Sequence, residues 1–102
     1  GIEPVSSSIP NSFELFQNYP NPFNPVTTIR FSIPNSANGR NELTTLKIFD
    51  ILGKELSVPV NEILSPGEYE ISWDASGYPS GVYFCTISNG TYSQSRKMIV
   101  VK

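Results

Sequence analysis

The sequence predicts an all-β fold: an immunoglobulin-like antiparallel β-sandwich of about seven short strands. Apolar residues recur at every second position in short runs, which indicates strands with one buried and one solvated face. Turn residues separate these runs at spacings of roughly 8 to 12 residues. No helical period is sustained anywhere in the chain. A small β-barrel is the alternative architecture.

The chain of 102 residues is long enough for one domain with one core. Residues 1–12 contain three consecutive serines and two prolines without any apolar period, so we expect a linker from a preceding protein. This segment lacks the basic start and the apolar run of a signal peptide. The folded domain is therefore predicted to cover residues 13–102.

The first half of this domain is expected to contain four strands. In the clearest of them Ile29, Phe31 and Ile33 alternate with polar residues, and Pro34 ends the run. Pro59 ends another strand in the same way. The expected strands are residues 13–16, 27–33, 45–48 and 55–58.

Three further strands are expected in the second half. The turn signal at residues 65–67 precedes a run in which Tyr69, Ile71 and Trp73 alternate with polar residues. The pair Asn89-Gly90 predicts a type I′ hairpin turn, although Asn89-Gly90-Thr91 also matches an N-glycosylation acceptor. The expected strands are residues 69–73, 82–87 and 91–101.

The inward positions of these strands supply the predicted core. Tyr83 lies two residues before Cys85, an arrangement typical of the tyrosine corner, whose phenol hydrogen-bonds back to the chain. Cys85 is the single cysteine and is expected to be buried and inert, because no histidine or neighbouring cation would lower its pKa. The predicted core consists of Phe13, Ile29, Phe31, Ile33, Leu46, Ile48, Leu56, Tyr69, Ile71, Trp73, Tyr83, Ile87 and Met98.

The composition argues against an enzyme, a metal site and a cofactor. Histidine is absent, so the usual neutral-pH base and the commonest metal ligand are missing. Glu68 and Glu70 share the wet face of a strand, where their acidity would be ordinary, and Asp50 and Asp74 are expected to cap turns. The seven cations are dispersed, which disfavours nucleic acid, and Pro and Gly interrupt any membrane span.

Residues 18–25 contain three prolines and three asparagines, more than a connecting loop requires. Proline fixes φ and asparagine closes local turns, so a stiff loop is expected, with Tyr19 and Phe23 packed as apolar pegs onto the sandwich. It would act either as a lid over the end or edge of a sheet or as a rigid recognition surface. The predicted rigid loop consists of Tyr19, Pro20, Asn21, Pro22, Phe23, Asn24 and Pro25.

Residues 95–102 are predicted to form the closing strand, with cations at both ends. One interpretation is an edge strand that lysine protects from unwanted pairing. The other is an address made of a terminal carboxylate, Lys102 and the sheet edge, on which another protein docks by strand addition. The residues alone leave both interpretations open.

Five motifs, taken in order along residues 13–102, resemble the type A C-terminal sorting domain of the type IX (Por) secretion system. Cys85 departs from this pattern, because the family usually carries an aromatic or aliphatic residue there. The motifs are Leu15–Pro25 (LFQNYPNPFNP), Thr28–Pro34 (TIRFSIP), Lys47–Lys54 (KIFDILGK), Gly81–Phe84 (GVYF) and Lys97–Lys102 (KMIVVK).

The resemblance implies a non-enzymatic cargo tag of Gram-negative bacteria. Its partners would be an N-terminal cargo domain, the translocon and a sortase-like peptidase. The cargo would pass through the periplasm and then be released or attached to surface lipopolysaccharide. Recognition residues carried over from the family are Gly81, Tyr83, Lys97 and Lys102, and the cleavage region is expected near Ser6, Ser7 and Ser8.

We hypothesise that the machinery engages the last hairpin, residues 82–102, through main-chain pairing and its terminal charges. Two alternatives from other classes remain. A carbohydrate-binding module would need an exposed aromatic platform, for which Phe49, Tyr78 and Tyr92 are the plausible members. A purely structural immunoglobulin-like spacer would need no recognition surface.

Overall fold

The computed structural model describes residues 2–6, 8–36 and 38–102, which form eight β-strands. Within these ranges no helix is long and apolar enough to cross a membrane. The strands are β1 (Glu3–Ser6), β2 (Glu14–Leu15), β3 (Val26–Ile33), β4 (Leu43–Phe49), β5 (Glu55–Ile63), β6 (Gly67–Asp74), β7 (Gly81–Asn89) and β8 (Tyr92–Val100).

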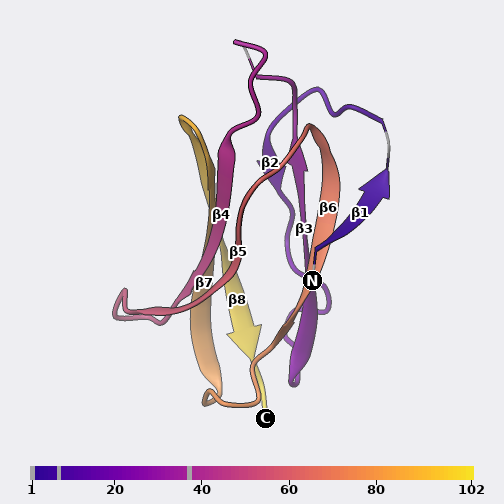
Figure 1. Cartoon of the computed structure of the whole chain (residues 1–102). Coiled ribbons are helices and arrows are strands. Elements are labelled where there is room, and N and C mark those ends of the chain that lie inside the picture. The colour runs from indigo at the N-terminus through magenta and orange to yellow at the C-terminus, as the bar shows by residue number, and fades with distance from the viewer. Residues whose placement is uncertain (1, 7, 37) are drawn as a thin grey trace.

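The strands form two four-stranded antiparallel sheets that pack face to face (Figure 1). Sheet I has the order β1-β6-β3-β2, and sheet II has the order β5-β4-β7-β8. The spatial order of the strands is that of immunoglobulin domains. In sheet I, β2, β3 and β6 correspond to strands A, B and E, and in sheet II, β5, β4, β7 and β8 correspond to strands C′, C, F and G. The predicted all-β sandwich is confirmed, with one strand more than expected.

The core lies between the two sheets because the apolar residues of each strand share one face. In sheet I, Ile29 stands opposite Ile71, and in sheet II, Leu46 stands opposite Ile87. All predicted core residues are buried except Leu56, which is half-buried. The structure adds to the core Leu15, Phe23, Val60, Leu64, Ala75, Cys85 and Val100.

Strand β1 lies within the segment expected to be a linker. Glu3 pairs with Glu70 and Pro4 with Tyr69, so β1 forms the outer edge of sheet I beside β6. Ile2 packs against the core as a partly buried residue. Within the segment expected to be a linker, residues 3–6 thus form a strand, because backbone pairing with β6 does not require an apolar period.

Strand β5 continues through Pro59, where the sequence predicted that it would end. The register of β4 with β5 shifts between Leu46 and Ile48, and the partner of Leu46 is Val60 whereas that of Ile48 is Ser57. Pro59 thus lies in an irregular stretch of an edge strand. Proline is tolerated in such a position because its missing N–H is not needed by the ladder.

The turn between β7 and β8 differs from the predicted type I′ turn. Asn89 pairs with Tyr92, so the two-residue loop is Gly90–Thr91. A type I′ turn requires a positive φ at both central residues. Gly90 has a φ of 59°, but no described non-glycine residue has a positive φ, so Thr91 does not meet this requirement. A glycine with positive φ at the first position followed by Thr91 fits a type II′ turn.

Candidate functional site

The two lysines of the closing strand lie on the surface at separate places. Lys97 stands directly opposite Phe84 on the outer face of sheet II. Lys102 lies at the end of the sandwich, where its backbone N–H donates to Ser80 Oγ at 2.9 Å and its Nζ donates to Ser76 O at 2.9 Å. Lys102 lies five positions after Lys97, which corresponds to roughly 16 Å along an extended chain, so the two lysines do not form one charged site.

Tyr83 and Gly81 do not present side chains at the surface. The Tyr83 ring is 4% exposed, and its hydroxyl donates to Pro79 O at 2.6 Å, as the tyrosine-corner interpretation predicted. Burial raises the pKa of this phenol. Gly81 is exposed with a φ of 153°, a conformation that favours glycine. The Tyr83 ring is therefore buried in the folded domain, and Gly81 offers only its backbone at the surface.

The outer edge of β8 is covered by residues 17–23, which we call the strap. Phe23 N–H donates to Ile99 O, and Val101 N–H donates to Phe23 O, both at 3.0 Å. Between these two bonds, Ile99 N–H donates to the side-chain oxygen Oδ1 of Asn21 at 2.9 Å. The strap thus satisfies the backbone groups that an edge strand would otherwise leave open.

Side chains extend this coverage along β8. Gln17 Nε2 donates to Lys97 O at 2.8 Å, and Arg96 Nε donates to Leu15 O at 2.8 Å. Gln94 Oε1 accepts from Leu15 N–H at 2.8 Å. The strap therefore occupies the outer edge of β8 between Lys97 and Val101, so main-chain pairing of another protein with this part of the hairpin would require the strap to move.

Sequence reasoning did not identify Gln94 and Arg96 as structural residues. By alternation they share the inward side of β8 with Met98 and Val100, which are both buried. Polar side chains at inward positions need hydrogen-bond partners. Polar residues at the inward positions of β8 are therefore the sequence signal from which a neighbouring segment of the chain could have been predicted.

Two residues organise the strap, and a third does not contribute as expected. Asn18 is 2% exposed, and its Nδ2 donates to Thr27 Oγ1 at 3.0 Å and to Pro20 O at 3.1 Å. Phe23 is 3% exposed and acts as the predicted peg, whereas Tyr19 is 80% exposed and does not. The expected rigid loop therefore forms a lid over a sheet edge, with the Tyr19 ring in solvent.

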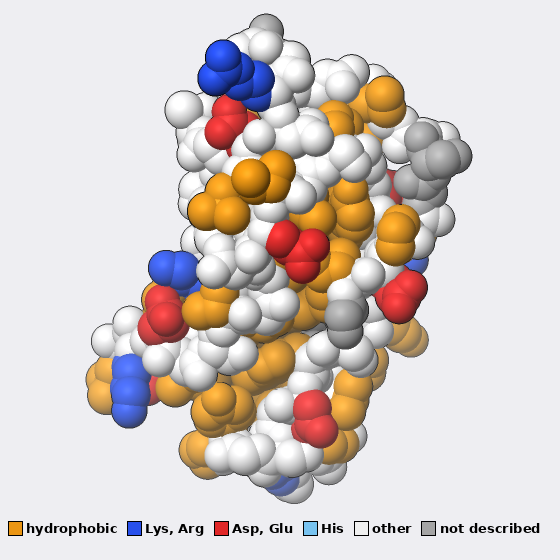
Figure 2. Space-filling model, viewed as in Figure 1, with side chains coloured by type: hydrophobic (Ala, Val, Ile, Leu, Met, Phe, Trp, Pro, Cys, Tyr) orange, Lys and Arg blue, Asp and Glu red, His pale blue; other side chains and the backbone are white. Residues whose placement is uncertain are grey.

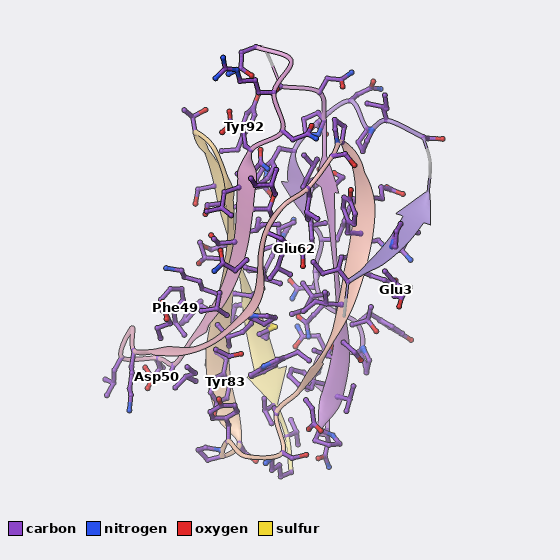
Figure 3. The ribbon with its side chains drawn as sticks, viewed as in Figure 1. Glu3, Phe49, Asp50, Glu62, Tyr83 and Tyr92 are labelled. Carbon is purple, nitrogen blue, oxygen red and sulfur yellow. The ribbon has the colours of Figure 1, made fainter. Side chains whose placement is uncertain are left out.

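The aromatic residues suggested for a carbohydrate platform lie apart. Tyr92 stacks on Phe13 at one end of the sandwich, with ring centroids 5.3 Å apart. Phe49 lies on the outer face of sheet II (Figure 3). Tyr78 is half-buried and stacks on Trp73 at 5.7 Å. These rings do not form one exposed surface of the kind that a sugar ring stacks on.

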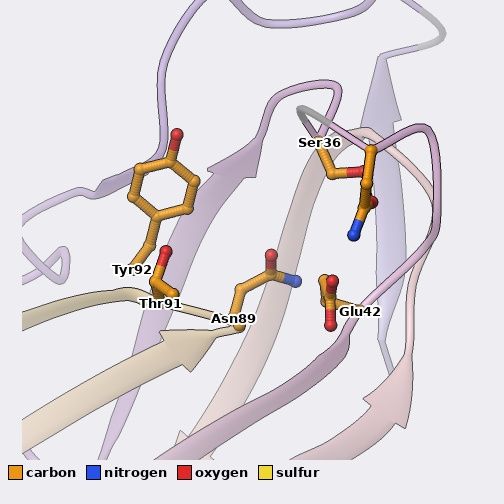
Figure 4. Close-up of a pocket in the computed structure, with 7 residues that line it drawn as sticks. Ser36, Glu42, Asn89, Thr91 and Tyr92 are labelled. Carbon is orange, nitrogen blue, oxygen red and sulfur yellow. The ribbon is translucent and has the colours of Figure 1, made fainter.

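A polar hollow of about 320 Å³ lies at the end of the sandwich beside the β7–β8 turn (Figure 4). Glu42, Asn89 and Tyr92 contribute to its wall. Asn89 is 5% exposed, and its Nδ2 donates to Thr44 Oγ1 at 2.7 Å. The amide that N-glycosylation would modify is therefore engaged inside the fold, which supports the turn interpretation of this sequence.

A second hollow, of about 560 Å³, lies over the outer face of sheet I beside Tyr19. Arg30 and Glu70 form an exposed ion pair in it, with 3.2 Å between Nη2 and Oε2, and Glu68 lies nearby. An exposed ion pair contributes little stability because water and salt screen it. The described residues contain no group of three side chains able to hold a metal ion.

Asp50 and Asp74 cap turns, as the sequence predicted. Asp50 Oδ1 accepts from the N–H groups of Leu52 and Lys54, each at 2.9 Å. Asp74 Oδ1 accepts from Ser76 N–H at 2.9 Å. The hydrogen bonds from Ser76 hold the pKa of the Asp74 carboxyl below its ordinary value.

The expected cleavage region follows the first strand. Ser6 is the last residue of β1, Ser7 lies outside the described residues, and Ser8 is exposed and belongs to no strand. From Ser8 to Ser12 the chain is in no strand. A stretch outside the strands gives a peptidase access to the backbone.

Cys85 is fully buried, and burial raises the pKa of its thiol from 9.0 to about 11. Because the folded state disfavours the thiolate, the stability present below pH 9 should decline as the pH rises toward 11. The expected loss reaches about 2–3 kcal/mol. We expect urea unfolding to show this decline in the wild type and a shallower one in Cys85→Ala; equal slopes would contradict the burial argument.

Comparison with protein families gives a match over most of the chain. A family model described as "Secretion system C-terminal sorting domain" matches residues 17–102. The match begins at the strap and runs through the strands of both sheets to the last residue, while β1 and β2 precede it. No curated protein matches the chain.

Proposed function

The chain belongs to the family of secretion system C-terminal sorting domains, and we propose that the type IX translocon recognises its folded sandwich as one unit. Domains of this family are C-terminal sorting signals of type IX secretion: they follow an N-terminal cargo and direct it to the cell surface or the medium. The family is not an enzyme family. Sorting is accordingly a binding event.

The observation that carries this proposal is the extent of the family match. It covers the strap and the six strands β3 to β8, which belong to both sheets, and is not confined to the closing hairpin. The closing motif itself contributes Met98 and Val100 to the core, with exposures of 0% and 1%. A signal whose residues build the core acts through the surface that the whole fold presents, whatever cargo precedes it.

The proposal includes transit through the periplasm and removal of the domain by a sortase-like peptidase. Cleavage between Ser6 and Ser12 is supported by the absence of strand structure after β1 among the described residues of this stretch. A cut there would leave β1 on the cargo and the other seven strands in the domain. Lys97 and Lys102, exposed and ordered, remain the proposed recognition side chains.

Deletion of Lys97–Lys102 does not test this proposal, because it removes two core residues and the attachment of the strap. A matched pair of substitutions distinguishes recognition of the folded domain from recognition of a linear sequence signal. Ile71 is 5% exposed on β6 and Ser72 is its exposed neighbour, and both are far in sequence from the closing motif. Ile71→Asp buries an unpaired charge and should unfold the domain, whereas Ser72→Asp should not.

We expect a reporter fused ahead of residues 1–102 to be exported with wild-type domain or Ser72→Asp, and to be retained with Ile71→Asp or without the domain. The reporter in the medium and its C-terminal mass are measured in a host that has the type IX system. Export of Ile71→Asp at the wild-type level would show that a linear signal suffices. Export without the domain would refute the sorting role, and a reporter C-terminus outside residues 6–12 would refute the cleavage region.

A further inference from the structure

Most of the residues in the motifs of sheet II lie outside the core. Strands β4, β7 and β8 alternate strictly, so Ile48, Tyr83 and Met98 point inward while their neighbours point outward. The strap and the core explain the inward set. The outward set consists of Lys47, Phe49, Val82, Phe84, Lys97 and Ile99.

Four of these side chains form one apolar area, which we call the apolar quartet: Phe49, Val82, Phe84 and Ile99. Phe49 stands directly opposite Phe84, and Val82 stands directly opposite Ile99. Directly paired residues on one face have Cβ atoms about 4.5–5.5 Å apart. All four are half-buried, so three strands bring together an apolar surface that nothing in the described chain covers further.

The β4–β5 hairpin extends this surface outward. Its tip projects from the sandwich on the side of sheet II, and hydrophobic and charged side chains gather there (Figures 1 and 2). Ile51 is 69% exposed and Leu52 is 89% exposed. The carboxylate of Asp50 holds the tip in shape through the two hydrogen bonds described above, and Gly53 N–H donates to Asp50 O at 3.0 Å. An ordered tip with two exposed aliphatic side chains loses little conformational entropy on binding.

Charge distinguishes the two outer faces. Lys47 and Lys97 lie on the outer face of sheet II beside the quartet, and Lys54 lies at the tip. Against these three lysines stand the carboxylates of Glu55, whose Oε1 lies 3.3 Å from Lys47 Nζ, and of Asp50 in the tip. Among described residues, neither of the two ion pairs includes Lys54 or Lys97. This area is therefore cationic although the chain carries a net charge of -2.

The outer face of sheet I has the opposite character. Glu3, Glu68 and Glu70 lie on it, and Arg30 pairs with Glu70. Its central pairs, such as Thr28 with Ser72, are polar. A second copy of the chain could therefore offer carboxylates to the quartet but not an apolar centre, which makes self-association a poor match.

We infer that the apolar quartet and the hairpin tip form a docking surface for a protein whose own surface has an apolar centre surrounded by carboxylates. This inference rests on the proposed function, because that protein belongs to the export machinery. The apolar centre would supply affinity through the two phenylalanines. The lysines would steer the encounter and select an acidic partner.

The chain offers a matched control on the same sheet. Leu43 and Ile63 are a directly opposed apolar pair, 51% and 67% exposed, toward the other end of sheet II. The test compares Phe49→Thr/Phe84→Thr with Leu43→Thr/Ile63→Thr, since threonine keeps strand propensity in both. We expect export of the reporter to fall about tenfold or more in the first variant and to change less than about twofold in the control.

Two further variants keep the inference falsifiable if the phenylalanine variant loses stability. Ile51→Ser/Leu52→Ser changes only exposed side chains of the tip and should reduce export to a similar extent. Lys97→Glu should reduce it, whereas Arg40→Glu, the same charge change in an exposed loop residue, should not. Circular dichroism melting of each purified domain verifies that the variants are folded.

The outcomes separate this inference from the proposed function. Normal export of folded quartet, tip and Lys97→Glu variants, together with loss of export when the domain is deleted, would overturn the docking surface and the role of Lys97 but leave the sorting function standing. Binding of the wild-type domain to phosphatidylglycerol vesicles that is lost in the quartet variant would identify a lipid surface and overturn the protein partner. A concentration-dependent dimer that the quartet variant lacks would assign the surface to a second copy.

Discussion

Replacing Trp73 by alanine is expected to destabilise the domain by about 3–5 kcal/mol, which is the usual cost of removing a large aromatic side chain from a core. Trp73 is 6% exposed and lies at the centre of an aromatic cluster. Its ring centroid is 6.0 Å from that of Phe23, 5.7 Å from Tyr78 and 6.1 Å from Tyr83. A domain of this size has a total stability of about 5–15 kcal/mol, so the variant should be partly unfolded at body temperature.

The measurement is urea unfolding followed by far-UV circular dichroism, because Trp73 is the single tryptophan and its fluorescence is lost in the variant. Ser72→Ala, at the exposed neighbouring position, is the control and should change stability by less than about 0.5 kcal/mol. A loss below about 1 kcal/mol in Trp73→Ala would mean that the cluster contributes far less than its burial indicates.

Replacing Phe23 by alanine is expected to cause the second largest loss of stability and also to loosen the end of β8, which is distant in sequence. Phe23 is 3% exposed, and its backbone bonds hold Ile99 and Val101 at the edge of β8. Removal of the ring should cost about 3–5 kcal/mol. Because the ring anchors the strap, the amide of Val101 should also exchange its hydrogen faster than in the wild type.

Tyr19→Ala is the control for this prediction, since it removes another aromatic ring from the same strap. Tyr19 is 80% exposed, so its removal should change stability by less than about 0.5 kcal/mol and leave exchange at Val101 unaltered. Urea unfolding and hydrogen-exchange mass spectrometry measure the two quantities. Equal losses in both variants would show that the ring of Phe23 does not anchor the strap.

Closure of the β8 edge bears directly on how the sorting signal is presented. An open edge strand of nine residues would invite pairing with other chains during export. The strap bonds to this edge between Lys97 and Val101, while the Gln94 and Arg96 side chains bond to the backbone of Leu15. Along the covered part of β8, the outer face of sheet II therefore presents side chains and not free backbone groups.

Local alternation was sufficient to predict the core of the domain. Ile29, Phe31 and Ile71 are buried because every second residue of a strand faces the same side, and this rule needs no knowledge of the partner strand. The Tyr83 hydrogen bond and the inert Cys85 were predictable for a similar reason, since each depends on a short stretch of chain and on burial.

Edges and surfaces were not predictable in this way, because they depend on which segments approach one another in space. Tyr19 and Phe23 occur in the same proline-rich sequence, yet only Phe23 reaches the core. Residues 3–6 form a strand only because the edge of β6 is available to them.

Periodicity and motif order are properties of the linear chain, and they sufficed to predict the sandwich, most of its buried residues and the family. They did not predict that the strap covers part of the β8 edge across about eighty residues of sequence, or that Phe49 and Phe84 share one outer face. Strand pairing and edge coverage are contacts between distant segments, which local propensity does not encode.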